Sequence, residues 1–222
     1  MPNSPQQPAA DLSHAQSPDD FHRTLRAALA QVDALGAQTV AASGAKLACC
    51  AGCGLCCTLR VDVFAHEVFL VAHHIRAHFS PAERAALTAR LAVHGEKVRP
   101  LTPFGHATQN IVCPLLRDSR CSVYADRPHT CRRHHSLDFA ACQFTYDHPT
   151  DLDFPGAHDR DLFRTLTEAM RQGAETYAQL GYDTTIYELG TALAEALESP
   201  ASWRRWRAHE KAFLHASETP AA

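Results

Sequence analysis

Residues 49–57 decide how this chain folds, and they read Cys49-Cys50-Ala51-Gly52-Cys53-Gly54-Leu55-Cys56-Cys57. Gaps of two residues separate the cysteines at positions 50, 53 and 56, so a tight turn between them lets successive sulfur atoms converge on one centre. Gly52 and Gly54 suit such a turn, because glycine adopts positive φ without steric cost. A pattern that starts at Cys49, with three residues before Cys53, is an alternative register, and the sequence leaves this choice open.

A second group of cysteines follows some sixty residues later, at Cys113, Cys121, Cys131 and Cys142. Two short apolar runs flank the polar residues 117–120, and this pattern predicts a β-hairpin. The hairpin would bring Cys113 and Cys121 close together. The remaining two cysteines lie on the segment that follows.

Three interpretations of the clustered cysteines compete. A disulfide framework suits secreted chains, whereas residues 1–18 lack the basic and apolar regions of a secretory signal, which predicts a cytoplasmic protein with reduced thiols. Catalytic redox chemistry needs two thiols and leaves most of the nine unexplained. Metal binding accounts for the clustering, because thiolates select zinc, copper(I) or iron–sulfur clusters.

Eight thiols remain when Cys49 is set aside, enough for two four-coordinate sites, or for one cluster and one mononuclear site. Zinc prefers four tetrahedral ligands, and a [4Fe–4S] cluster also takes four thiolates. The C-x-x-C-x-x-C spacing is that of bacterial ferredoxins, but their fourth ligand position is missing here. Spacing alone therefore leaves zinc and an iron–sulfur cluster as alternative cofactors.

The pattern resembles the CxxCxxCC, or YkgJ-type, cysteine-cluster family, which is described as zinc- or iron-chelating. The resemblance covers about residues 46–145, and it includes the string Cys121-x-Val-Tyr-x-x-Arg-Pro-x-x-Cys131-Arg. It implies metal ligation by eight residues: Cys50, Cys53, Cys56, Cys57, Cys113, Cys121, Cys131 and Cys142. The related flagellin lysine-N-methylase carries a similar cluster, but this chain shows no glycine-rich motif for a nucleotide-like cofactor.

Composition excludes other classes of function. The chain has 222 residues, of which 45% are hydrophobic, and its 21 basic and 24 acidic residues give a formal charge of −3. A nucleic-acid partner is not expected, because binding phosphates requires an excess of basic residues. No run of about 18 apolar residues occurs, so no membrane partner is expected either.

Hydrophobic periodicity predicts a mainly α fold around a small, irregular α+β cysteine-rich core. Ser17-Pro18-Asp19-Asp20 predicts the start of a helix that ends at Gly36, with residues 37–48 as a connector. Further predictions are a strand at 59–63, helices over 68–79 and 80–98, a helix from Asp159 to Gly181, a helix over 186–197, and a last helix carrying Trp203, Trp206 and Phe213.

The predicted organisation is a disordered tail (1–16), a helix with the metal-binding domain (17–145), a helical extension packed on the same domain (146–216), and a second tail (217–222). Trp203 and Trp206 are expected to cap a core, with an exposed partner-binding anchor as the alternative. The C-terminal helices are expected to pack on the N-terminal helix and to enclose the cysteines.

Fifteen histidines accompany the cysteines, and most are expected to be packing residues. His129, His134 and His135 flank Cys131 and are candidates for substitute ligands or for support of the ligands. Three functions remain open: a metal-binding protein, an iron–sulfur-dependent enzyme with an accessible cluster edge beside a pocket, and a metal-trafficking protein that uses exposed cysteines.

Overall fold

The computed structural model describes residues 17–151, 153 and 156–220. The structure is mainly helical with small antiparallel sheets, which confirms the predicted fold class. The tail expected at 1–16 lies outside the described residues. None of the helices in the described part of the chain combines the length and the apolar character that crossing a membrane requires.

The N-terminal helix α2 (Pro18–Ser43) begins as predicted and ends later than predicted. The Ser17 side chain accepts a hydrogen bond from the Asp20 backbone N–H and caps the helix. Gly36 does not end it. This residue packs on α8 (Arg160–Gln179), where a Cβ would lie 3.5 Å from Leu166 and 3.6 Å from Leu162, in ordinary van der Waals contact. The helix stops instead at Gly44, which has a φ of 68°.

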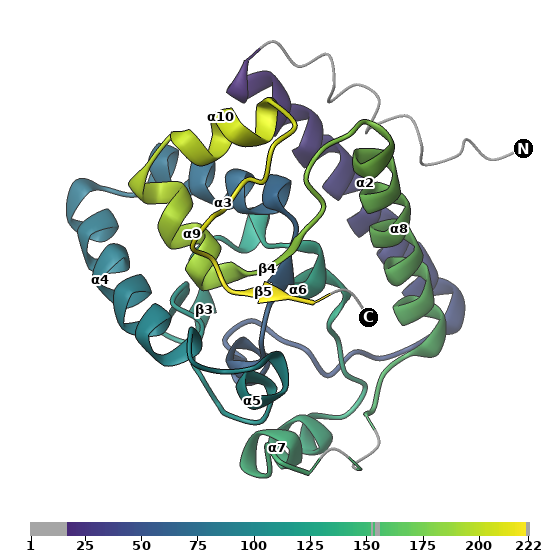
Figure 1. The fold of residues 1–222 in the computed structure, drawn as a ribbon. Helices are drawn as coiled ribbons and strands as arrows, with labels where there is room; N and C mark the ends of the chain where they lie inside the picture. The colour runs from purple at the N-terminus through teal and green to yellow at the C-terminus, as the bar shows by residue number, and fades with distance from the viewer. Residues whose placement is uncertain (1–16, 152, 154–155, 221–222) are drawn as a thin grey trace, which may run out of the picture.

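Helix α3 (Ala65–His78) forms the centre of the molecule, and its residues 65–72 are all buried. Figure 1 shows α4 (Pro81–Val98) on one side of it, and α2 with α8 on the other. The capping box predicted at Ser80 is present at the start of α4. Helix α9 (Leu189–Glu198) packs on both α3 and α4, so the C-terminal part of the chain completes the core.

A three-stranded antiparallel sheet joins distant parts of the chain in the order β1 (Asp62–Val63), β4 (Ile186–Glu188) and β5 (Glu218–Thr219). Strand β1 is shorter than the predicted strand 59–63. Ile186, which its periodicity places in a helix, lies in β4, because the helix begins only after Glu188 caps it. The disordered tail expected from residue 217 is also corrected, since β5 pairs with β4 there.

The last helix, α10 (Ala201–Arg207), closes an aromatic cluster. Trp206 is fully buried and contacts Phe21 of α2 and Phe69 of α3, which confirms that the tryptophans cap a core. Phe213, which is expected on this helix, lies in the loop beyond it, because the chain leaves the helix through His209 at a φ of 62°.

The remaining elements are short and carry the cysteines. They are η1 (Leu55–Thr58), α5 (Pro103–Ala107), the hairpin strands β2 (Leu116–Arg117) and β3 (Arg120–Cys121), η2 (Tyr124–Asp126), α6 (His129–Arg133) and α7 (Phe139–Asp147). The hairpin is present as predicted, and its turn residues Asp118 and Ser119 both have positive φ. The cysteines therefore flank the hydrophobic core, and the C-terminal helices do not enclose them.

Candidate metal centre

The two cysteine stretches meet directly. The backbone N–H of Cys113 donates a hydrogen bond of 2.7 Å to the carbonyl of Cys57. Helix α7, which carries Cys142, contacts η1, which carries Cys56 and Cys57. Residues that are more than fifty positions apart thus lie in one region of the fold. All nine cysteines are free thiols.

The first stretch folds as two successive turns. Gly52 has a φ of 91°, and the Cys53 N–H donates to the Cys50 carbonyl at 3.2 Å. A second turn follows, in which the Cys57 N–H donates to the Gly54 carbonyl at 3.0 Å. A Cβ on Gly54 would lie 3.2 Å from the Leu116 side chain, so this glycine allows the hairpin to approach closely. The glycines thus serve the turn and the contact between the stretches.

Helix α6 is fixed on the core at both residues that precede Cys131. The Thr130 hydroxyl donates to the Asp62 carbonyl on β1 at 2.6 Å. The backbone N–H of His129 donates to the buried carboxylate of Glu67 on α3 at 2.7 Å. Cys131 is therefore held by a strand and a helix, and its own thiol packs against the hydrophobic core.

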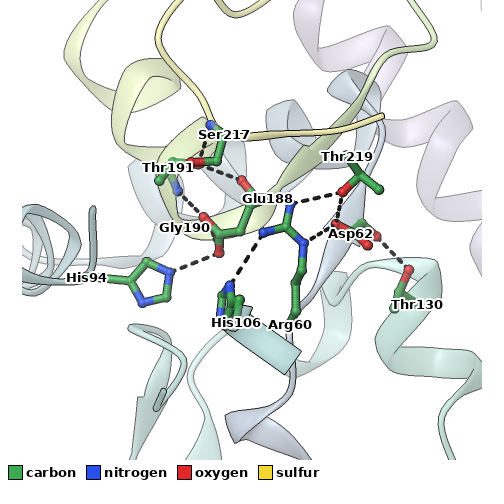
Figure 2. Close-up of polar contacts among 10 residues, drawn as sticks. All are labelled: Arg60, Asp62, His94, His106, Thr130, Glu188, Gly190, Thr191, Ser217 and Thr219. Atoms are coloured by element: carbon green, nitrogen blue, oxygen red, sulfur yellow. Dashed lines mark hydrogen bonds and ion pairs between the residues drawn. The ribbon is translucent and has the colours of Figure 1, made fainter. Parts of the chain in front are cut away.

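A buried polar network links this region to the sheet (Figure 2). The Arg60 guanidinium donates to Asp62 at 2.8 Å and to the Thr219 hydroxyl at 2.9 Å, so it joins β1 to β5. On the other side of the network, Glu188 pairs with His94 of α4 at 2.9 Å. Burial alone would raise the pKa of Glu188, but His94 and two backbone N–H groups at the start of α9 lower it to about 2.

Sequence reasoning missed this network, because its members are up to 159 positions apart and no spacing connects them. A small space beside it is lined by His94, Glu188 and Cys113. The network therefore supports the base of the cysteine region.

An inner group of thiols comprises Cys113, Cys121 and Cys131, which are half-buried against the core. Burial raises the pKa of Cys113 to about 12, and the neighbouring Cys121 thiol adds to this effect. Burial also raises the pKa of Cys131, with further contributions from Cys113, Cys121 and Cys56. These three thiols and Cys56 thus lie within electrostatic range of one another.

An outer group comprises Cys49, Cys53, Cys56 and Cys142. Burial raises the pKa of Cys49, and the thiols of Cys56, Cys142 and Cys53 raise it further. The thiol of Cys56 is hydrogen-bonded to that of Cys57, which raises the pKa of Cys56. Cys56 therefore belongs to both groups. Cys49, which the resemblance leaves outside the ligand set, lies among the proposed ligands.

The thiols are close without forming a closed cage. Among the described residues, the group of cysteine, histidine and acidic side chains whose ligand atoms all lie within 4.8 Å of one another is Asp19, His22 and His73, which is outside the cysteine region. Sulfur is nevertheless the dominant donor where the stretches meet, and soft thiolates are the ligands that zinc and iron–sulfur clusters prefer. The donor set fits these metals, and binding would draw the sulfur atoms together.

Two of the three histidines that flank Cys131 are occupied by backbone contacts. The His129 Nε2 bonds to the Leu166 carbonyl at 2.9 Å, and burial lowers the pKa of His129 to about 4. The His135 Nε2 accepts a hydrogen bond from the Asp159 N–H at 3.0 Å. His129 and His135 therefore act as packing residues, and both His134 and His135 line the cavity described next.

A mainly apolar cavity of about 370 Å³ opens beside the outer group. Cys56 and Cys142 are in its wall, together with Arg133, His134 and His158. A small molecule entering this cavity would meet two cysteines and a cationic side chain. No spacing in the sequence predicts this cavity, because its walls come from η1, α6, α7 and the loop before α8.

Residues 49–150 match the family CxxCxxCC, described as "Putative zinc- or iron-chelating domain". The match spans both cysteine stretches and includes Cys49. Neither the curated proteins nor the solved structures include a match to this chain.

Proposed function

We propose that this chain is a metal-chelating protein in which thiolates from both cysteine stretches hold zinc or an iron–sulfur cluster. The carrying observation is the 2.7 Å hydrogen bond between the Cys113 N–H and the Cys57 carbonyl, which joins the stretches. The chelating description of the matched family supports the same conclusion. The proposed ligands are Cys50, Cys53, Cys56, Cys57, Cys113, Cys121, Cys131 and Cys142.

The neighbours of each thiol support a division into two four-sulfur sites. The inner site takes Cys113, Cys121, Cys131 and one thiol of the Cys56–Cys57 pair. The outer site takes the other thiol of that pair, Cys53, Cys142, and one thiol of the adjacent Cys49–Cys50 pair. The free thiols are protonated at neutral pH where burial raises their pKa, so metal binding must release protons.

The metal decides what the site can do. Zinc held by four thiolates has no open position and would stabilise the fold, whereas an iron–sulfur cluster can also accept an electron. Either metal requires reduced thiols, which suits a reducing compartment such as the cytosol.

The test is elemental analysis and an optical spectrum of anaerobically purified protein. We expect stoichiometric zinc or iron, and a brown colour in the case of iron. Cys131→Ser should lose the metal of the inner site and keep that of the outer site, whereas Cys142→Ser should do the reverse. A metal-free protein that is fully folded would refute the proposal.

The choice between Cys49 and Cys50 has its own test. The outer site needs only one of the two, so we compare Cys49→Ser with Cys50→Ser under the same conditions. The register Cys50, Cys53, Cys56 predicts that only Cys50→Ser lowers the metal content. Loss in Cys49→Ser alone would shift the register by one residue.

The cavity favours a second function, an enzyme that uses an iron–sulfur cluster in redox or methyl-transfer chemistry. An enzyme needs an accessible metal edge, and Cys56 and Cys142 lie in the cavity wall. A small anion such as cyanide should then change the optical spectrum of the loaded protein. Thr145→Trp would fill the cavity from an exposed position and should abolish this change. An unchanged response in Thr145→Trp would contradict a role for the cavity.

A further inference from the structure

Asp19, His22 and His73 form a compact group that none of the functions above uses. Asp19 and His22 come from the first turn and a half of α2, and His73 comes from α3. The ligand atoms of the three side chains all lie within 4.8 Å of one another. Figure 1 shows the beginning of α2 at the top of the molecule, whereas α7 and its cysteine lie at the bottom. The group is therefore separate from the cysteine region.

His22 is the most unusual member of the group. It is 5% exposed, and neither of its ring nitrogens has a hydrogen-bond partner of normal geometry among the described residues, although the Phe69 carbonyl lies near the ring. Buried polar atoms are nearly always paired, so two unpaired nitrogens on one side chain require an explanation. A metal ion would supply a partner for one of the two nitrogens.

The ring of His22 is held in position by its neighbours. It stacks on the His73 ring at a centroid distance of 4.1 Å. The rings of Phe21 and Trp203 also pack on it, at centroid distances of 5.5 and 5.9 Å. These contacts fix both imidazoles before any ligand binds. The carboxylate of Asp19 is 84% exposed, so the group is open to solvent on that side.

The distance between Asp19 and His73 also fits an intervening ion. The His73 Nδ1 lies 3.8 Å from the Asp19 carboxylate oxygen, which is too long for a direct hydrogen bond. Two ligands that are each about 2.0–2.1 Å from a tetrahedral zinc ion lie about 3.3–3.4 Å apart. A small movement of the exposed Asp19 side chain would therefore close the site.

The positive charge nearest to the group is already balanced. Arg26, one turn after His22, makes a two-pronged ion pair with Asp126 at 2.8 Å for each bond. The neighbouring His74 also bonds to Asp126, at 2.7 Å, so it is occupied elsewhere. The Asp19 carboxylate thus provides net negative charge where a cation would bind.

We propose that Asp19, His22 and His73 bind a divalent transition-metal ion of the zinc class, with a fourth coordination position open to solvent. Two imidazoles and one carboxylate are a ligand set of zinc sites that keep an open position. Such an ion would join the first turns of α2 to the central helix α3. Metal at this site would therefore stabilise the docking of the N-terminal helix.

The experiment uses Co²⁺ as the probe, added to the full chain after it has received only the equivalents of Zn²⁺ that its thiolates take up, because excess Zn²⁺ would also occupy the proposed site. Cobalt bound to thiolates gives intense charge-transfer bands in the near ultraviolet, whereas cobalt bound to nitrogen and oxygen gives only weak visible bands. We expect one further equivalent of Co²⁺ with weak visible bands alone. Asp19→Asn and His73→Asn should weaken its binding at least tenfold.

His78→Asn is the matched control, because His78 is an exposed histidine on the same helix and outside the group. It should bind cobalt as the unaltered protein does. Asp19 is exposed, so its substitution tests the site without disturbing the core. A wild-type protein that takes up no further cobalt, or an extra equivalent that persists in Asp19→Asn and His73→Asn, would overturn the proposal.

Discussion

Replacing Gly190 by alanine tests the buried network beneath the cysteine region. Gly190 is the second residue of α9 and lies against the His94 ring. A Cβ at this position would be 2.4 Å from His94 Cδ2, 2.5 Å from Nε2 and 3.2 Å from a Glu188 oxygen. The added methyl group must therefore push the imidazole away from Glu188.

The loss of folding stability depends on the contact that the methyl group displaces. The side chains of His94 and Glu188 are 5% and 3% exposed, and breaking a buried ion pair costs about 3–5 kcal/mol when one partner is removed. Displacement costs less than removal, and alanine is favoured over glycine in a helix by about 1 kcal/mol. We therefore expect Gly190→Ala to lower the free energy of unfolding by about 2–3 kcal/mol.

Urea unfolding followed by circular dichroism measures this change, and the midpoint should fall without a change in slope. Gly173→Ala on α8 is the matched control, because a Cβ there meets nothing within 4 Å. The control should raise stability by about 0.5–1 kcal/mol through helix propensity alone. A Gly190→Ala protein as stable as the wild type would refute the close packing of His94 on this helix end.

Three further changes test other parts of the structure. Burial lowers the pKa of His66 to about 3 and that of His129 to about 4, so the unfolded chain takes up protons first as the pH falls below the usual value of 6.5. The stability from these two groups should be complete above about pH 7 and should drop by about 3–4 kcal/mol between pH 7 and 5 in urea unfolding. Equal stability at both pH values would contradict this. Ser119 has a φ of 58° in the hairpin turn, a conformation that glycine adopts without strain, so Ser119→Gly should raise the free energy of unfolding by about 0.5–1 kcal/mol. A lower midpoint in urea unfolding would contradict this. Thr130→Val removes the hydroxyl that donates to the Asp62 carbonyl, so it should lower the free energy of unfolding by about 1–2 kcal/mol and weaken metal retention. Chelator competition measures the retention, and unaltered retention would show that this bond does not position Cys131.

Local signals in the sequence predicted where several elements begin, and tertiary contacts decided where others end. Ser17, Pro18 and the capping box at Ser80 fix helix starts through hydrogen bonds within four residues, so the sequence alone predicts them. Gly36 looked like a helix end, but it is a packing position that only the location of α8 explains. Ile186 fits a helical pattern and a strand equally well, and pairing with β1 and β5 decides for the strand.

The candidate sites divide in the same way. The cysteines could be predicted as candidate ligands because their spacing is typical of metal sites. The hairpin around residues 117–120 could be predicted because apolar residues flank a polar turn. The pair of His94 and Glu188 could not be predicted, because the two residues are 94 positions apart. The role of His22 could not be predicted either, because a single histidine near the start of a helix has no diagnostic spacing. Only the fold brings His73 of α3 beside it.

The short sheet has a consequence for the order of events during synthesis. Strand β1 precedes the second cysteine stretch, yet its partner strand comes from residues 186–188 and the next strand from 218–219. Until the ribosome has made residues 186–188, β1 has no partner strand, and until it has made Thr219, Arg60 lacks one of its hydrogen bonds. A nascent chain would therefore display both cysteine stretches before the scaffold beneath them is complete, since the last strand of that scaffold exists only after residue 219 has been made.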